Sequence, residues 1–265
     1  MTKEELDFFK TWFDDYTASF RFPEKKDQSN VLLKVKHTRG VCGNIMLLAK
    51  ALSLDGSEAM LAESIGLFHD IGRFLQYQKY RTFRDSVSEN HAVLGVTILS
   101  ESGVLKKLPG REQDIILFSV KFHNSLAMPD LQDDDRLLFL KLIRDADKLD
   151  IYRVFGEYYE LPEEERASAA GLELPDAPGY SRDVLACIFE RKIATLSSLR
   201  TLNDFKLMKL SWIYDLNFRA SLQLLRERNY VGKLLETMPG TEELDRVLLF
   251  LEDYMDKRLS EIDRL

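Results

Sequence analysis

The sequence contains four histidines, His37, His69, His91 and His123. Each shares the face of a predicted helix with apolar residues three, four or seven positions away. Imidazole nitrogens bind transition metals, and burying four imidazoles without partners costs free energy. The four could be satisfied in separate places, as histidines on apolar helix faces usually are. One shared metal site would account for all of them at once.

Carboxylates that could complete such a site stand beside two of the predicted helices. Asp70 directly follows His69, where Gly72 breaks the helix, so an ion above the last turn could meet both side chains. The run RDADKLD, residues 144–150, offers Asp145 and Asp147, which face nearly opposite directions on a helix. We predict that the ligand is Asp147, because it occupies an otherwise apolar stripe.

The remaining acids of this run have other predicted roles. Asp145 has Lys141 and Lys148 within helical reach and can form surface ion pairs, so we interpret it as structural or as supporting a ligand. Asp150 could help to orient a ligand.

The elements that must position these residues are helices. Apolar periodicity predicts helices over 4–20, 29–53, 57–69, 88–102, 110–123 and 134–160, and helical structure again over 181–265. Ser29 and Ser57 are candidate N-caps. The sequence has no alternating strand pattern and no fixed-period repeat, so we predict an all-α fold.

A stretch rich in proline and glycine suggests how the chain is divided. Residues 161–180 are typical of a connecting loop. We predict a core with an N-terminal helix over 1–160, a connector loop over 161–180 and a C-terminal helical portion over 181–265, packed on the core.

Composition limits the classes of partner. Hydrophobic residues make up 45% and charged residues 31% of the chain, which is usual for a globular protein. The net charge of -7 and the lack of a basic stripe argue against nucleic acid as a partner. Apolar runs are too short to cross a membrane, and the N-terminus lacks the pattern of a signal peptide. We therefore expect a cytoplasmic protein. The amphipathic stretch 234–265 could mediate homo-oligomerisation, although core packing is the alternative.

Taken in order, these features resemble the HD superfamily of metal-dependent phosphohydrolases. The resemblance is carried by HTRGV from residue 37, FHDIGR from 68, HAVLG from 91, FHN from 122 and DADKLD from 145. It spans about residues 37–154. It implies a helical bundle, the HD domain, which binds metals between its helices, with additional helices following it in this chain.

The resemblance also implies a ligand set. His37, His69, Asp70 and Asp147 would bind a first metal, and Asp70 would bridge to a second ion completed by His91 and His123. Four imidazoles and two carboxylates suit two divalent ions of manganese, iron, cobalt, nickel or zinc better than magnesium or calcium.

Hydrolysis of a phosphate ester or anhydride is the activity that this resemblance implies. The substrate would be a small phosphorylated molecule, such as a nucleotide, attacked by a metal-activated water, with Asp70 as the catalytic residue. Arg73 stands where the family often has Lys or Arg and could hold a phosphate oxygen, or it could form a surface ion pair. The basic and aromatic run 79–84 could grip the substrate or be a solvated loop.

Two other functions compete with hydrolysis. HD proteins of the inositol oxygenase and organophosphonate oxygenase types have a similar ligand set and use a mixed-valence di-iron centre to activate oxygen. That alternative predicts iron and oxygen uptake with a small organic substrate. A non-catalytic sensor with structural metals is the third reading, and the complete ligand set argues against it. The lack of Gly-Tyr-Pro near His123 argues against a cyclic di-nucleotide substrate.

Overall fold

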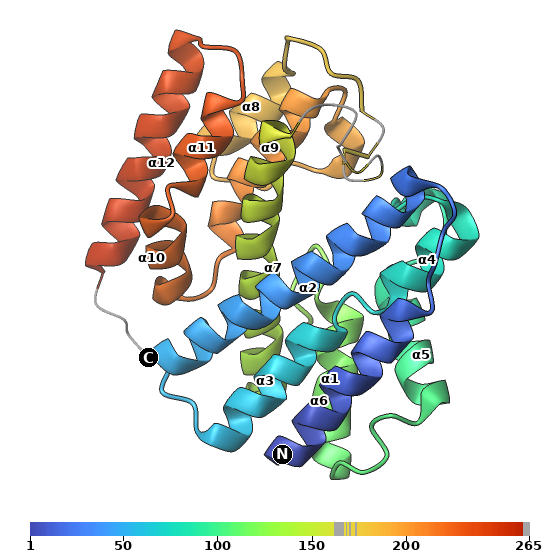
Figure 1. The fold of residues 1–265 in the computed structure, drawn as a ribbon. Helices are drawn as coiled ribbons and strands as arrows, with labels where there is room; N and C mark the ends of the chain where they lie inside the picture. The colour runs from blue at the N-terminus through green and yellow to red at the C-terminus, as the bar shows by residue number, and fades with distance from the viewer. Residues whose placement is uncertain (162–166, 168, 170, 173, 262–265) are drawn as a thin grey trace. The chain divides into compact units, whose positions relative to one another are not determined.

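The computed structural model describes residues 1–161, 167, 169, 171–172 and 174–261. All regular secondary structure in this part of the chain is helical, which confirms the predicted all-α fold (Figure 1). Contacts divide the chain into two compact units. Unit 1 comprises Met1–Asp150 with Ala167–Leu172, and unit 2 comprises Ile151–Arg166 with Glu173–Leu265. The predicted connector and the last four residues of the amphipathic stretch fall partly or wholly outside the described residues, and our three-part division stays a prediction.

Unit 1 carries all four histidines. Its α2 packs along α3, α4 packs along α5, and α3 also contacts α1 and α6. Its elements are α1 (Lys3–Ala18), α2 (Lys25–Ala51), α3 (Gly56–Phe68), α4 (Gly72–Tyr80), the 3-10 helix η1 (Asp85–Val87), α5 (His91–Ser102), α6 (Gly110–Phe122) and the first part of α7 (Asp134–Glu160).

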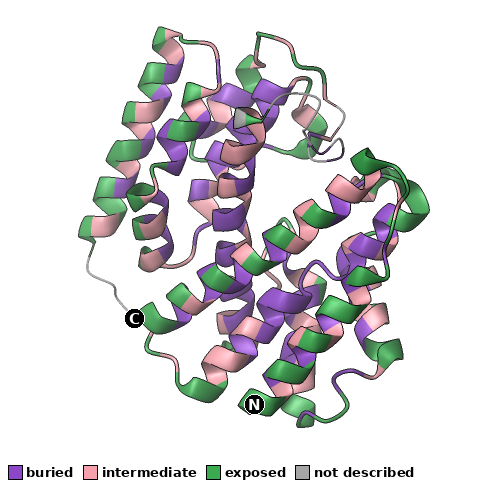
Figure 2. Cartoon of the chain, in the orientation of Figure 1, coloured by how far each residue is buried: buried purple, intermediate pink, exposed green. Residues whose placement is uncertain are grey.

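An aromatic cluster in the core of unit 1 includes the two phenylalanines that flank the His69–Asp70 dipeptide in the sequence. Helix α1 buries Phe9 and Phe13, and Figure 2 shows one buried and one exposed face along this helix. The ring of Phe9 meets the edge of Phe68 at a centroid distance of 5.2 Å, and Phe13 meets Phe74 at 6.0 Å. Such pairs add to the free energy gained by burial. Because Phe68 and Phe74 lie on either side of His69 and Asp70, this packing fixes the chain around both.

Two predicted helix caps are wrong. Helix α2 begins at Lys25, and Ser29 lies inside it, where its hydroxyl donates to the Lys25 carbonyl at 2.9 Å. Helix α3 is capped by Asp55 rather than Ser57. The Asp55 carboxylate accepts from the Glu58 amide at 2.9 Å, and Glu58 accepts from the Asp55 amide. This reciprocal pair satisfies two free amides, which a serine two positions later cannot do.

Unit 2 is built around α9, in which every residue is buried. The Tyr152 ring, from the second part of α7, stacks on Tyr230 at 6.1 Å, and its hydroxyl donates to the Lys209 carbonyl at 2.6 Å. The other elements of the unit are α8 (Arg182–Phe189), the 3-10 helix η3 (Leu196–Ser198), α9 (Leu202–Ser211), the 3-10 helix η4 (Trp212–Asp215), α10 (Arg219–Glu227), α11 (Tyr230–Glu236) and α12 (Glu242–Ser260).

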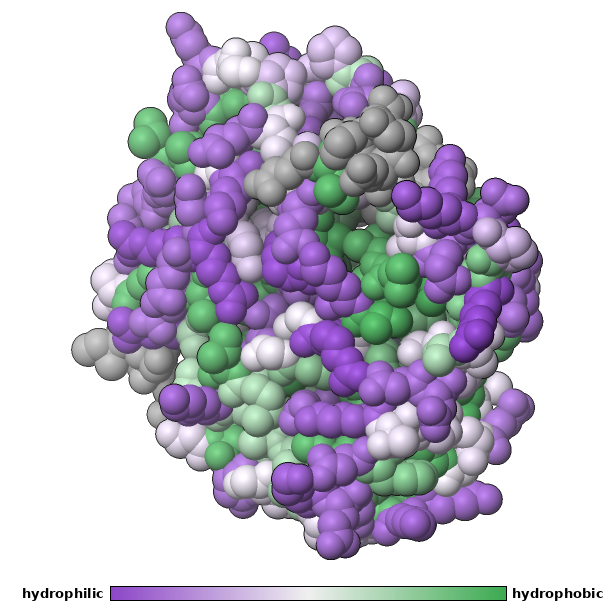
Figure 3. All heavy atoms as spheres, in the orientation of Figure 1, coloured by the Kyte–Doolittle hydropathy of each residue, from purple (hydrophilic) through white to green (hydrophobic). Residues whose placement is uncertain are grey.

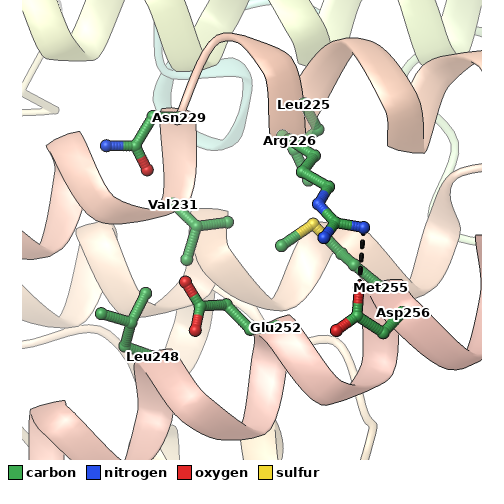
Figure 4. Close-up of a pocket in the computed structure, with 8 residues that line it drawn as sticks. All are labelled: Leu225, Arg226, Asn229, Val231, Leu248, Glu252, Met255 and Asp256. Carbon is green, nitrogen blue, oxygen red and sulfur yellow. Dashed lines mark ion pairs between the residues drawn. The ribbon is translucent and has the colours of Figure 1, made fainter.

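A pocket of about 240 Å³ lies among α10, α11 and α12 (Figure 4). Arg226 and Asp256 form an ion pair of 2.7 Å beside it, and both side chains are more than half exposed. Exposed pairs of this kind contribute little to stability. None of the predicted site residues lines this pocket.

The surface carries both hydrophilic and hydrophobic side chains. Hydrophilic and hydrophobic residues are interspersed over the face shown in Figure 3. Among the described residues, no helix has both the length and the apolar character that crossing a membrane requires.

Candidate metal centre

The four histidines lie at the inner ends or on the inner face of four helices of unit 1. His37 is within α2, His69 directly follows α3, His91 is the first residue of α5, and His123 directly follows α6. All four are buried. The centroids of neighbouring rings are 5.0 to 5.4 Å apart, so the four imidazoles form one cluster.

The Nδ1 atom of each ring faces an acceptor outside the cluster. In the His37 ring it lies 2.7 Å from Asp150 Oδ2, and in the His69 ring 2.8 Å from the Gly66 carbonyl. These acceptors fix the orientation of the rings, as the outer partners of metal-binding histidines do. Asp150 is therefore in position to orient the His37 ring.

The other two rings are held in the same way. Nδ1 of His91 lies 2.8 Å from Asp85 Oδ2, and Nδ1 of His123 lies 2.8 Å from the Val120 carbonyl. Carbonyls and ionised carboxylates only accept hydrogen bonds, so the proton of each neutral imidazole belongs on Nδ1. Nε2 then presents a lone pair. The Nε2 atoms of His91 and His123 are only 3.1 Å apart, and two facing lone pairs at that distance repel each other unless a proton or a metal ion lies between them.

The His69 ring also presents a nitrogen that needs a positively charged partner. Its Nε2 is buried and has no hydrogen-bond partner in the described part of the chain. Its closest carboxylate oxygens belong to Asp147, at 3.7 Å, and Asp70, at 3.8 Å. A buried polar atom without a partner is costly, and a metal ion among these atoms would remove the cost. The residues at the centre therefore fit a bound metal.

Asp70 lies in the middle of the cluster. Its Oδ2 is 3.7 Å from His37 Nε2 and 3.8 Å from His69 Nε2. Its Oδ1 is 3.3 Å from His91 Nε2 and 3.8 Å from His123 Nε2. We call His37, His69 and Asp70 the first triad, and Asp70, His91 and His123 the second triad. Within each triad the potential ligand atoms lie within 4.8 Å of one another, so each could hold one ion.

Asp147 lies beside the first triad, with Oδ1 at 3.1 Å from His37 Nε2. The structure thus brings together the six residues predicted as ligands. The prediction for Asp145 was wrong in one respect, because this residue is fully buried rather than at the surface, whereas the Asp147 side chain is 18% exposed. Helix α7 has buried residues on all its sides between Phe139 and Asp150, so a single inward stripe does not describe it.

The protonation states of two histidines and two carboxylates of the centre suit metal binding. Burial lowers the pKa of His69 to about 4, and burial together with the charge of Arg73 lowers the pKa of His91 to about 3. Burial opposes the ionisation of Asp70 and Asp147. Lys34 and His69 nevertheless hold the pKa of Asp70 well below its usual range, and His37 and His69 lower that of Asp147. These two carboxylates are therefore ionised and the two imidazoles neutral at pH 7.

His37 differs from the other rings. Burial alone would lower its pKa, but the carboxylates of Asp147 and Asp150 raise the pKa of His37 to about 9. In the metal-free chain this imidazole keeps a second proton at neutral pH. That proton supplies the positive charge that the carboxylates would otherwise take from a metal ion, and a metal must displace it.

Two glycines allow the helices to approach at the centre. A Cβ atom on Gly40 would lie 1.9 Å from Asp150 Oδ1, so this glycine leaves room for the carboxylate that reaches His37. A Cβ atom on Gly72 would lie 2.1 Å from the His91 carbonyl and 2.7 Å from the Gly95 amide. Gly72, in the HDIG sequence, thereby brings the start of α4 against α5 and places His91 beside Asp70.

Arg73 lies at the edge of the centre and forms an ion pair with Asp85, which is half-buried rather than at the surface. Its side chain is 15% exposed, and Nη1 donates to Asp85 Oδ1 at 2.8 Å and to the Phe83 carbonyl at 2.6 Å. Gln76, one turn later in α4, also donates to Asp85 Oδ1 at 2.8 Å. Helix α4 therefore fixes Asp85, which in turn orients His91.

Sequence reasoning missed Asp85 and Lys34. Asp85 lies in η1, outside any periodic pattern, so its sequence position gave no signal. Lys34 Nζ lies 2.7 Å from Asp70 Oδ2. Lys34 stands three residues before His37, one turn away on the same face of α2, and this spacing could have indicated it.

The basic and aromatic run 79–84 is engaged in local contacts. Lys79 and Tyr80 end α4, a helix that the sequence analysis did not predict, and both contact Glu89. Arg81 lies over the Phe22 ring at 4.2 Å. Phe83 is buried. Lys79, Tyr80 and Arg81 are exposed, so the run is partly solvated, and a role in gripping the substrate stays a prediction.

Comparison with known families agrees with this geometry. Residues 35–152 match the family model of the HD domain, and this range includes all six predicted ligands. The chain matches no curated protein and no solved structure. HD domains are typical of metal-dependent hydrolases and bind divalent metals. Residues 35–152 therefore form an HD domain.

Proposed function

We propose that this chain is a metal-dependent phosphohydrolase with a binuclear site, which cleaves a phosphate ester or anhydride of a small molecule. The position of Asp70 carries the proposal, because its two carboxylate oxygens face two different pairs of histidines. A carboxylate shared in this way can hold two ions side by side, which is the arrangement that two-metal hydrolysis requires.

The two triads suggest how the ligands are divided. His37, His69 and Asp147 would hold one ion together with Asp70 Oδ2, and His91 and His123 would hold the other with Oδ1. Mixed imidazole and carboxylate ligands favour manganese, iron, cobalt, nickel or zinc over magnesium and calcium.

The residues of the metal centre each have a defined part in this proposal. Bound at the triads, two ions would lower the pKa of a water molecule and polarise a phosphoryl oxygen. Asp70 would act as the catalytic carboxylate by keeping the ions adjacent. Asp150 and Asp85 would keep the imidazoles of His37 and His91 in the orientation that presents Nε2 to the ions.

Arg73 is the proposed substrate-binding residue. Its Nη1 is occupied by Asp85, Phe83 and Gln76, whereas Nη2 makes no hydrogen bond within the described part of the chain. A guanidinium whose orientation is fixed at one nitrogen can offer the other to a phosphoryl oxygen without losing much side-chain entropy.

The first test is elemental analysis of protein purified without added metal, beside the His91→Ala and His123→Ala variants. We expect about two ions per chain in the wild type, as the two triads imply, and about one in each variant. Circular dichroism of the variants controls for loss of the fold. A wild-type protein that neither contains nor takes up metal would contradict the proposal.

The second test is activity. The metal-loaded protein should release phosphate or pyrophosphate from members of a panel of nucleotides and phosphomonoesters, and a chelator should abolish the release. His69→Ala is the matched inactive control. If the native metal is iron, and oxygen uptake with an organic substrate is observed in place of phosphate release, the oxygenase alternative replaces this proposal.

A further inference from the structure

Lys34 is a cation inside the centre that neither belongs to the proposed ligand set nor orients a histidine ring. Its Nζ lies 2.7 Å from Asp70 Oδ2, and its side chain is 17% exposed. Lys34 therefore contacts the carboxylate that both triads share, and part of its side chain is open to solvent.

The hydrogen-bonding capacity of Lys34 is only partly used. An ammonium group has three N–H donors. Within the described part of the chain, Asp70 is the only hydrogen-bond acceptor of Nζ, and the remaining contact is with the face of Phe83, 5.2 Å from the ring centre. Two donors are thus available to a ligand.

A metal ion at the first triad changes the electrostatics around Lys34. The oxygen that Lys34 contacts, Asp70 Oδ2, is the one that faces His37 and His69. An ion bound there would repel the ammonium at short range. Lys34 can keep its place near such an ion most favourably when an anion lies between the two charges.

Arg73 adds a second cation to the same region. Its Nε lies 3.5 Å from Asp70 Oδ1, and its guanidinium carbon lies 5.9 Å from the centre of the Phe83 ring that Lys34 also contacts. Two fixed cationic side chains beside two metal positions create a positive environment that suits a group with more than one negative charge. A terminal phosphate carries about two negative charges at pH 7, whereas a phosphodiester carries one.

We propose that Lys34 binds the phosphoryl group of the substrate and, together with Arg73, selects a terminal phosphate over an internal phosphodiester. This inference rests on the proposed function and specifies its substrate class. The ammonium would keep its contact with Asp70 and donate its two remaining N–H groups to phosphoryl oxygens.

The test measures binding of inorganic phosphate to the metal-loaded protein by calorimetry. Lys34→Met keeps the length of the side chain and removes its charge, and we expect phosphate affinity to fall at least about tenfold, as for a lost hydrogen bond to a charged group. Lys36→Met, on the exposed side of α2, is the matched control and should bind phosphate like the wild type.

Metal content of the same samples separates anion binding from a structural role. Lys34→Met should contain as much metal as the wild type or more, since a cation next to Asp70 has been removed. Loss of metal together with phosphate binding would show that Lys34 only holds Asp70, and would overturn the inference. Unchanged phosphate affinity in Lys34→Met would overturn it as well.

Activity distinguishes a failure of this inference from a failure of the proposed function. A wild type that binds phosphate through Lys34 but hydrolyses no phosphate compound contradicts the proposed function and retains the anion site. In an active wild type, the ratio of kcat/KM for a monoester to that for a diester should fall about tenfold or more in Lys34→Met. An unchanged ratio would overturn the selection of terminal phosphates while the proposed function stands.

Discussion

The first and second triads share Asp70 and use the same imidazole chemistry, yet their surroundings differ in charge. Asp147 and Asp150 surround His37 and raise its pKa, whereas burial and Arg73 lower the pKa of His91. The first triad therefore lies in a more negative environment. Because divalent ions are attracted by carboxylates, we expect the first triad to bind its ion more tightly than the second.

The two triads also differ in how they are supported. Asp150, which orients His37, belongs to the long helix α7, whereas Asp85, which orients His91, lies in the short helix η1 and is held by side chains of α4. The comparison teaches that four equivalent ligands can form two inequivalent metal positions. The following predictions test this inequivalence.

The largest effect is expected for Asp70→Asn, which removes the negative charge that both triads share. Affinity for both ions should fall more than about a hundredfold, beyond the range for residues that only support ligands. Metal titration followed by calorimetry measures the loss, and Asp130→Asn, an exposed acid of unit 1, is the control. If one ion still binds with wild-type affinity, Asp70 does not belong to both triads.

A smaller effect that separates the triads is expected from the two orienting carboxylates. Asp150→Asn should weaken binding of the tighter ion, and Asp85→Asn that of the weaker ion, each by roughly ten- to a hundredfold. Stepwise removal of metal with a chelator resolves the two ions. If either variant lost metal affinity equally at both positions, the separation of the triads would be contradicted.

The pH dependence of metal binding should distinguish the first triad. A metal ion must displace the extra proton of His37, whose pKa is about 9 in the metal-free chain. Below that pH, the affinity of the first triad should rise by up to about tenfold per pH unit, and it should level off above it. His91 of the second triad should make no such contribution, since it is already neutral at pH 7. Metal titrations between about pH 6 and 8 measure how steeply the affinity depends on pH. An affinity at the tighter site that does not change with pH would argue against displacement of a proton from His37.

The smallest effect concerns the helix contact that positions the second triad. Gly72→Ala places a Cβ atom 2.1 Å from a backbone carbonyl, and should lower the free energy of unfolding by about 1–3 kcal/mol. Gly43→Ala, where nothing lies within 4 Å, should leave it unchanged or raise it by up to about 1 kcal/mol. Urea unfolding of the metal-free proteins compares the two. A Gly72→Ala variant as stable as Gly43→Ala would show that this close approach is not required.

The sequence by itself determined the helical class and the candidate ligands. Residues on one helix face recur at spacings that depend only on helix geometry, so the inward positions of the histidines were visible without tertiary contacts. The HD pattern was visible for the same reason, because its segments are local. The role of Asp70 as a shared carboxylate stays a prediction that the structure supports geometrically.

Tertiary structure alone decided which residues surround the ligands. Asp85 reaches His91 because Arg73 and Gln76 of another helix hold it there, and Asp145 is buried because α7 is covered on all sides. The inequivalence of the triads arises from such contacts between elements. Periodicity along a chain reports the face that a residue occupies. Only packing between helices determines which charges meet on that face, and those charges set the proton and metal affinities of the site.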